Sequence, residues 1–173
     1  MELLSTFLTI VVPAGLVLFA MYLAIKSFMD KEARKGMIDL KLKSQEHILP
    51  IRLQAYERLC LFLERVSPGN IILRINNPTF TSAHLHQQLL TEIREEFNHN
   101  LSQQLYVSND AWAVTKKAME DIISVINNAS ATISPDSKSI ELAKAVFERM
   151  AQEGIDPALA ALNFVKNEAR QLF

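Results

Sequence analysis

Hydrophobic and polar positions divide the chain into an uncharged N-terminal run and a longer, patterned remainder. From Leu3 to Ile25 no side chain carries a charge. As an α-helix rising 1.5 Å per residue, this run is about 34 Å long, which is enough to cross the hydrocarbon core of a bilayer. A cleaved signal peptide is the alternative, but Glu2 and the lack of Lys or Arg before the run are atypical of one. The pattern predicts a retained anchor at residues 1–25, which contacts membrane lipid through residues 3–25.

Basic residues follow this run and do not precede it. Lys or Arg occupies positions 26, 31, 34, 35, 41 and 43, and an excess of these residues marks the cytoplasmic flank of a membrane span. We therefore predict a single-pass protein of the cell inner (cytoplasmic) membrane, with its N-terminus outside and its C-terminal domain in the cytoplasm. Two interpretations of four of these cations stay open: they contact anionic headgroups, or they serve only as a topology signal. These four are Lys26, Lys31, Arg34 and Lys35.

A heptad pattern begins at position 38 and overlaps the last two of these basic residues. Positions 38, 42, 45, 49, 52, 56, 59, 63 and 66 alternate spacings of four and three and are apolar except for Gln45 and Arg52. This pattern is typical of a coiled-coil helix that packs on partner helices. Pro50 is expected to kink or break the helix, and the period-two alternation of residues 38–43 leaves a short strand as an alternative. We favour helix, with a basic juxtamembrane stalk at 26–50 and a cytoplasmic helical domain at 51–173.

Turn and capping residues divide the rest of the chain into further helices. Ser67-Pro-Gly69 marks a turn, and the connector 70–77 is left open between a strand and an extended segment. Capping residues and apolar periodicity then predict four helices: Thr81 to Val107 with Ser82 as a cap, Ser108 to about Asn128, a third after Ser137 that closes at Gly154, and a last one opened by Asp156-Pro157. The predicted fold is all-α, an N-terminal transmembrane helix that continues into a cytoplasmic bundle of four to five helices.

The densest group of unusual polar residues lies between Glu92 and Tyr106. On a helix this segment buries one apolar face, and Gln104 and His86 fall within that face. Buried polar groups need partners, and the cations of the preceding helix and Arg74 in the connector are the nearest candidates. The sequence therefore predicts a polar layer between helices, made of eight candidate residues: Arg58, Arg65, Glu96, His99, Asn100, Gln103, Gln104 and Tyr106.

Three interpretations of this polar layer stay open. It is a hydrogen-bonded network that fixes helix register, a surface that binds another protein or a second copy of the chain, or a metal-binding or catalytic site centred on Glu96 and His99. The third rests on the Glu-x-x-His spacing of di-iron bundles, which need a second such motif that this sequence lacks. His84 and His86 do not replace it, because residues two apart on a helix point about 200° from each other.

Composition narrows the class of function further. The net charge of −1 and the pI near 6.4 give the chain no overall attraction for nucleic acid. The four glycines are isolated and form no phosphate-binding loop. The single cysteine, Cys60, excludes an internal disulfide and lies among leucines, as an inert core thiol would. We expect no cofactor and no small-molecule ligand, a protein partner or a homo-oligomer, and a role in protein contacts rather than catalysis.

Three segments carry a resemblance to a known family: Tyr56-Glu-Arg-Leu59, Phe62-Leu-Glu-Arg65 and the segment from Glu96 to Val107. In these segments the chain resembles an uncharacterised bacterial family of small single-span membrane proteins. The resemblance implies an anchor followed by a helical cytoplasmic domain. It implies no activity and no ligand, and it carries no functional residue over to this sequence.

Overall fold

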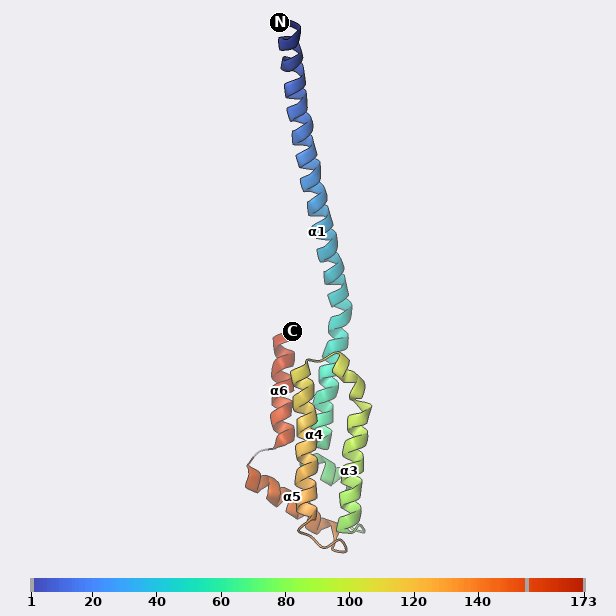
Figure 1. Cartoon of the computed structure of the whole chain (residues 1–173). Helices are drawn as coiled ribbons and strands as arrows, with labels where there is room; N and C mark the ends of the chain where they lie inside the picture. The colour runs from blue at the N-terminus through green and yellow to red at the C-terminus, as the bar shows by residue number, and fades with distance from the viewer. Residues whose placement is uncertain (1, 155, 173) are drawn as a thin grey trace. The chain divides into compact units, whose positions relative to one another are not determined.

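The computed structural model describes residues 2–154 and 156–172, with side chains placed except at 2–5, 8, 10, 38–41, 44, 153 and 172. Within these residues the chain is helical and forms no strand, apart from one isolated antiparallel bridge between Thr81 and Lys138. The all-α prediction is confirmed. The helices of Figure 1 are α1 (Glu2–Val66), α2 (Pro68–Ile75), α3 (Ser82–His99), the 3-10 helix η1 (Leu101–Leu105), α4 (Asn109–Ser130), α5 (Ser139–Glu153) and α6 (Pro157–Leu172).

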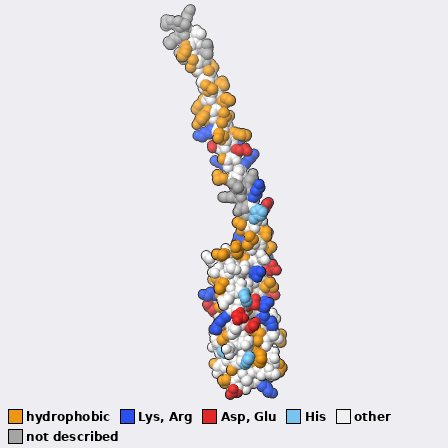
Figure 2. Space-filling view, turned by 90° about the vertical axis from the view of Figure 1, so that its right-hand side faces the viewer, with side chains coloured by type: hydrophobic (Ala, Val, Ile, Leu, Met, Phe, Trp, Pro, Cys, Tyr) orange, Lys and Arg blue, Asp and Glu red, His pale blue; other side chains and the backbone are white. Residues whose placement is uncertain are grey.

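The chain divides into two compact units, Met1–Leu49 and Pro50–Phe173. The first unit contains only the N-terminal part of α1, and every side chain described in it is exposed. Hydrophobic side chains gather on the N-terminal part of this helix, and charged ones follow them (Figure 2). The segment Val11–Met37 is long and apolar enough to cross a membrane, with a mean hydropathy of 1.9. It overlaps the predicted anchor and extends past the first basic residues.

Helix α1 continues through Pro50, so the helix favoured for this segment is confirmed and the proline does not break it. A proline inside a helix removes one backbone hydrogen bond and leaves the other bonds of the ladder in place. Residues 43–47 and 51–58 on either side are mostly good helix formers. The alternative of a strand at 38–43 is wrong, because this segment has helical backbone.

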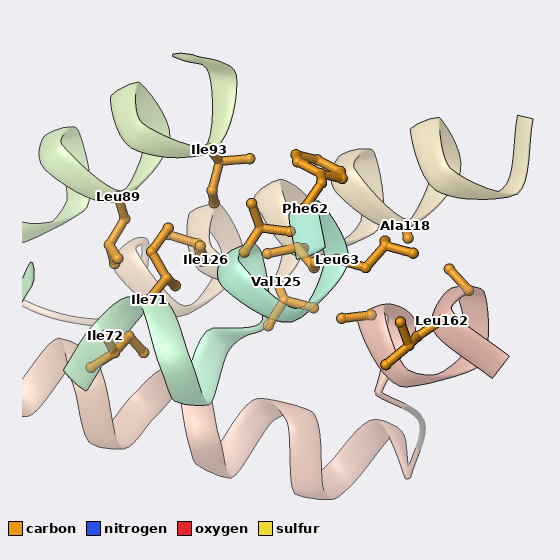
Figure 3. Close-up of a cluster of buried hydrophobic side chains, with 14 of the residues drawn as sticks. Phe62, Leu63, Ile71, Ile72, Leu89, Ile93, Ala118, Val125, Ile126 and Leu162 are labelled. Carbon is orange, nitrogen blue, oxygen red and sulfur yellow. The ribbon is translucent and has the colours of Figure 1, made fainter. Parts of the chain in front are cut away.

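The unit Pro50–Phe173 is a helical bundle with α4 at its centre. Helix α4 buries residues at spacings of three and four from Ala111 to Ala129, and it packs against α3, α5 and α6. The C-terminal stretch of α1 joins the same core, and Figure 3 shows side chains of α1, α2, α3, α4 and α6 meeting there. The second half of the heptad pattern therefore packs inside this bundle, at Tyr56, Leu59, Leu63 and Val66.

The connector that the sequence left open forms a helix, α2. Pro68 stands in its first turn, where the missing N–H has no intrahelical acceptor to lose. Ile71 and Ile72 are buried, whereas Leu73 is 81% exposed, because consecutive helical residues point about 100° apart. Three apolar residues in a row concealed this one-sided burial in the sequence.

Helix α3 ends earlier than predicted, at His99 rather than near Val107. The side-chain Nδ2 of Asn100 donates to the backbone oxygen of Glu96 at 2.8 Å, which satisfies one of the carbonyls left open at the end of the helix. The chain then continues as η1, so the helical phase of α3 does not extend to Gln104. Gln104 is exposed, and its predicted place on the buried face is wrong.

The starts of α3 and α5 are joined by hydrogen bonds. Thr81, rather than the predicted Ser82, caps α3, and its Oγ1 accepts from the backbone N–H of His84 at 3.2 Å. Ser82 is buried instead, and its Oγ donates to the backbone oxygen of Lys138 at 3.0 Å. Lys138 is also the N-cap of α5, one residue beyond the predicted Ser137.

Three other predicted helix ends are confirmed. The Oγ of Ser108 accepts from the backbone N–H of Ala111 at 2.9 Å and caps α4. Gly154 closes α5 with a φ of 67°, a left-handed conformation that glycine adopts without strain. The Oδ1 of Asp156 accepts from the backbone N–H of Ala158 at 2.9 Å at the start of α6.

Candidate functional site

The last stretch of α1 is linked to α3 by an ion pair. The Nε of Arg65 lies 3.0 Å from the Oε2 of Glu96, with side-chain exposures of 53% and 19%. Because the arginine is open to solvent, screening limits such a pair to about 1 kcal/mol or less. On the same helix, Glu92 Oε2 lies 3.8 Å from Arg74 Nη2. The predicted contacts between these arginines and α3 are therefore present in the structure.

The other candidate residues lie apart from this ion pair. Arg58 and His99 are exposed. The Nε2 of Gln103 donates to the hydroxyl of the adjacent serine at 3.3 Å. Tyr106 uses its backbone oxygen, which accepts from the Nε of Arg52 at 3.1 Å. Seven of the eight predicted residues are thus distributed over an ion pair, a helix end and the exposed turn that contains η1, and the eighth, Arg58, is exposed on α1.

Sequence reasoning missed the Tyr56 hydroxyl, which joins three elements of the bundle. Tyr56 is buried on α1. Its hydroxyl donates to the Oε1 of Glu168 on α6 at 2.5 Å and accepts from the backbone N–H of Ser108, the N-cap of α4, at 3.2 Å. A second contact between α1 and α6 joins Lys166 Nζ to Glu64 Oε1 at 3.3 Å. A tyrosine at a core heptad position was the available signal, because a buried hydroxyl usually has a partner.

The environment of Tyr56 keeps its hydroxyl protonated. Burial raises the pKa of Tyr56 above its usual value of 10.0, and the hydrogen bond to Glu168 raises it further. The backbone N–H of Ser108 and the side chain of Arg52 lower the pKa in part. The neutral hydroxyl is therefore a donor that fixes α1 against α6, and it is poorly suited to act as a nucleophile.

The structure assembles no set of metal ligands at Glu96 and His99. Within the part of the chain that it describes, no group of three or more His, Cys, Asp or Glu side chains is placed to hold a metal ion. The carboxylate of Glu96 contacts Arg65. His86 has a different role, since its Nε2 lies 2.8 Å from the Oδ1 of Asn127 on α4. The geometry therefore favours structural contacts over a metal centre.

An apolar groove of about 470 Å³ lies between α4 and α6. The two charged residues of its lining, Lys117 and Asp121, pair with each other at 2.9 Å. The rest of the lining contains no nucleophile and no acid or base: Val114, Ala118, Pro157, Ala160, Ala161 and Phe164. The groove offers hydrophobic contact and no evident chemistry.

Cys60 is expected to react slowly with thiol reagents. Burial raises the pKa of its thiol, and the acidic side chains of Glu64 and Glu57 raise it further, although Lys166 opposes them. Because the thiolate is the reactive form, we expect a disulfide reagent at pH 8 to react about tenfold more slowly with the folded protein than with the urea-unfolded chain. The absorbance of the released reagent thiolate gives both rates, and equal rates would contradict this expectation.

Comparison with known proteins identifies one family. Residues 2–172 match the family described as a family of unknown function, DUF7935. This description assigns no activity and names neither an organism nor a membrane, so the bacterial and membrane character of the resemblance stays a prediction. No curated protein and no solved structure matches the chain. Because the match runs over nearly the whole sequence, the chain belongs to this family of unknown function, DUF7935.

Proposed function

We propose that this protein is a single-pass membrane protein whose helical bundle serves as an interaction or scaffold subunit of a membrane-associated assembly. The observation that carries the proposal is the segment Val11–Met37, which is apolar and has none of its length buried by the rest of the protein. A long uncovered apolar helix is stable in lipid, where all its backbone groups are already hydrogen-bonded.

The charge pattern supports an orientation with the bundle in the cytoplasm. All charged residues of Val11–Met37 lie from Lys26 onward, so lipid would cover the uncharged part, residues 3–25. The basic residues of this flank favour the cytoplasmic side, where they reach anionic headgroups: Lys26, Lys31, Arg34 and Lys35.

The polar contacts of the bundle support a role in protein contacts rather than in catalysis. Tyr56 and Glu168 bond to each other, as do Arg65 and Glu96. These groups hold helices together, and the α4–α6 groove has no free reactive group in its lining. What the bundle offers a partner is a helical surface.

Alkaline extraction of membranes tests the anchor. We expect the full-length protein to stay in the pellet after carbonate treatment and to leave it in mild detergent, because an apolar span is held by lipid contact rather than by charge. The intact mass should retain residues 1–25. Release by carbonate, or a mass that lacks these residues, would overturn the anchor.

Orientation and association have separate readouts. Added protease should digest the bundle in inverted membrane vesicles and spare it in intact spheroplasts. The reverse result would contradict the proposed topology.

In gentle detergent we expect an oligomer or a complex with a partner, and a partnerless monomer would count against the scaffold role.

A further inference from the structure

Helix α1 leaves an apolar stripe uncovered between its basic segment and the bundle core. Leu42, Ile48, Leu49 and Leu53 are 53%, 47%, 45% and 49% exposed, whereas Tyr56, about one turn beyond Leu53, is buried. Single exposed leucines are ordinary, but these four and Ile51, which is 46% exposed, place five large aliphatic side chains within twelve consecutive positions of one helix, a patch that fits a partner surface.

Four of the five exposed residues occupy interface positions of the heptad pattern, and the fifth, Ile51, lies at an outer c position. Counting back from Tyr56 as an a position, the four take the following places: Leu42 and Leu49 at a, Ile48 at g and Leu53 at e. Gln45 holds the d position between the two leucines, and a polar residue in such a seam selects register. The next d residue, Arg52, is bonded to the backbone of Tyr106 in its own bundle. The uncovered seam therefore ends near Leu53.

The g and e positions make this seam complementary to a second copy in parallel orientation. In a parallel pair, a g residue of one helix lies beside the e residue of the next heptad on the other. Ile48 would then meet Leu53 of the second copy, an apolar pair. In the same register, Lys41 at g of one copy would lie beside Glu46 at e of the other copy, which pairs opposite charges. The side chain of residue 41 lies outside those that the structure describes, so this second pair is taken from the sequence.

From this complementarity we infer that residues 42–53 of α1 form a parallel two-helix seam with a second copy of this chain. The protein is then a homodimer whose bundles are joined through α1. The inference rests on the proposed function, because two anchors in one membrane hold the helices parallel and at high effective concentration. The later half of the heptad pattern, from Tyr56 to Val66, stays in the core of its own bundle.

Cysteine crosslinking of the full-length protein in membranes tests the seam. Cys60→Ala first removes the native thiol, so that each variant carries one cysteine. Leu42→Cys and Leu49→Cys should give disulfide-linked dimers on mild oxidation, because a positions face each other across a parallel pair. His47→Cys is the matched control at the outward f position, on a residue that is also exposed, and should give about tenfold less dimer.

Charge exchange provides a second readout. Glu46→Lys should lower the disulfide yield of Leu42→Cys by about threefold or more, because it places two lysines together. Adding Lys41→Glu should restore the yield. Failure of the restoration would overturn the assigned g–e pairing. Emission of Trp112, the sole tryptophan and a residue of the bundle, checks that each variant is folded.

The outcomes separate the dimer from the anchor. Equal yields at Leu49→Cys and His47→Cys, or no dimer at Leu42→Cys and Leu49→Cys in a folded protein, would overturn the seam. If the protein stays in the carbonate pellet while the seam thiols do not crosslink, the homodimer alone is overturned. If carbonate releases the protein, the anchor is overturned, and seam disulfides in the released protein would still support the dimer.

Discussion

Phe62→Ala is expected to destabilise the bundle by about 3–5 kcal/mol, the range for removing a fully buried aromatic side chain. Phe62 is 1% exposed, and its ring centroid lies 5.7 Å from that of Phe97 on α3. Phe97 in turn stacks on Trp112 of α4 with centroids 5.3 Å apart. Alanine would remove the α1 member of this aromatic series and leave a cavity within the cluster shown in Figure 3.

Urea unfolding of the detergent-solubilised protein measures this change. Trp112 is the sole tryptophan, so its emission follows the same aromatic series that the substitution disturbs. Leu61→Ala is the matched control, because Leu61 precedes Phe62 on the same helix but is 50% exposed. We expect its effect to stay within about 0.5 kcal/mol. Similar losses for both variants would show that α1 does not pack as the structure has it.

Helix α1 contributes residues to both units of the protein. It contains the apolar segment Val11–Met37, and its C-terminal stretch supplies Phe62 and Leu63 to the bundle core. The chain therefore passes from the proposed anchor to the bundle through helical backbone. The compact unit Pro50–Phe173 thus includes the C-terminal stretch of the same helix whose N-terminal part is apolar enough to cross a membrane.

Periodicity predicted the helices that bury one face along their length. Helix α4 is the clearest case, since Ser108 marks its start and Ile122 and Ile126 lie on a buried stripe. The same method failed at α2, where three adjacent apolar residues have no period. It also overran the end of α3, because one hydrogen bond from Asn100 to the backbone of Glu96 decides that end. Local contacts of this kind leave little trace in a hydrophobic pattern.

The candidate site was predictable only where polar groups of a buried face had cations nearby in the sequence. Arg65 was expected to contact α3 for this reason, and it pairs with Glu96. Tyr56 and Glu168 are 112 positions apart, and neither a tyrosine in a heptad nor a glutamate on a surface helix specifies its partner. Only the packing of α6 against the bundle brings the two together.

Tyr56→Phe is expected to lower the free energy of unfolding by about 1–3 kcal/mol. The substitution keeps the ring and removes the hydroxyl that donates to Glu168 and accepts from the backbone N–H of Ser108. Both of those groups then lose a partner in a partly buried setting. Tyr106→Phe is the matched control, because the interaction seen at Tyr106 uses its backbone oxygen, and its effect should be within about 0.5 kcal/mol. The urea experiment described for Phe62 applies unchanged.

The difference in stability between the wild type and Tyr56→Phe should depend on pH in the alkaline range. The pKa of Tyr56 in the folded protein is raised above the usual 10.0 by burial and by Glu168. The folded protein therefore holds this proton more tightly than the unfolded chain does. Its contribution to stability is complete below about pH 10 and is lost as the pH rises through the folded-state pKa. Urea unfolding of both proteins at several values from pH 8 to pH 11 measures the difference in their free energies of unfolding. The contributions of the other titrating groups, which both proteins share, cancel in this difference. A difference that stays constant or grows above pH 10 would contradict the role assigned to the Tyr56 hydroxyl.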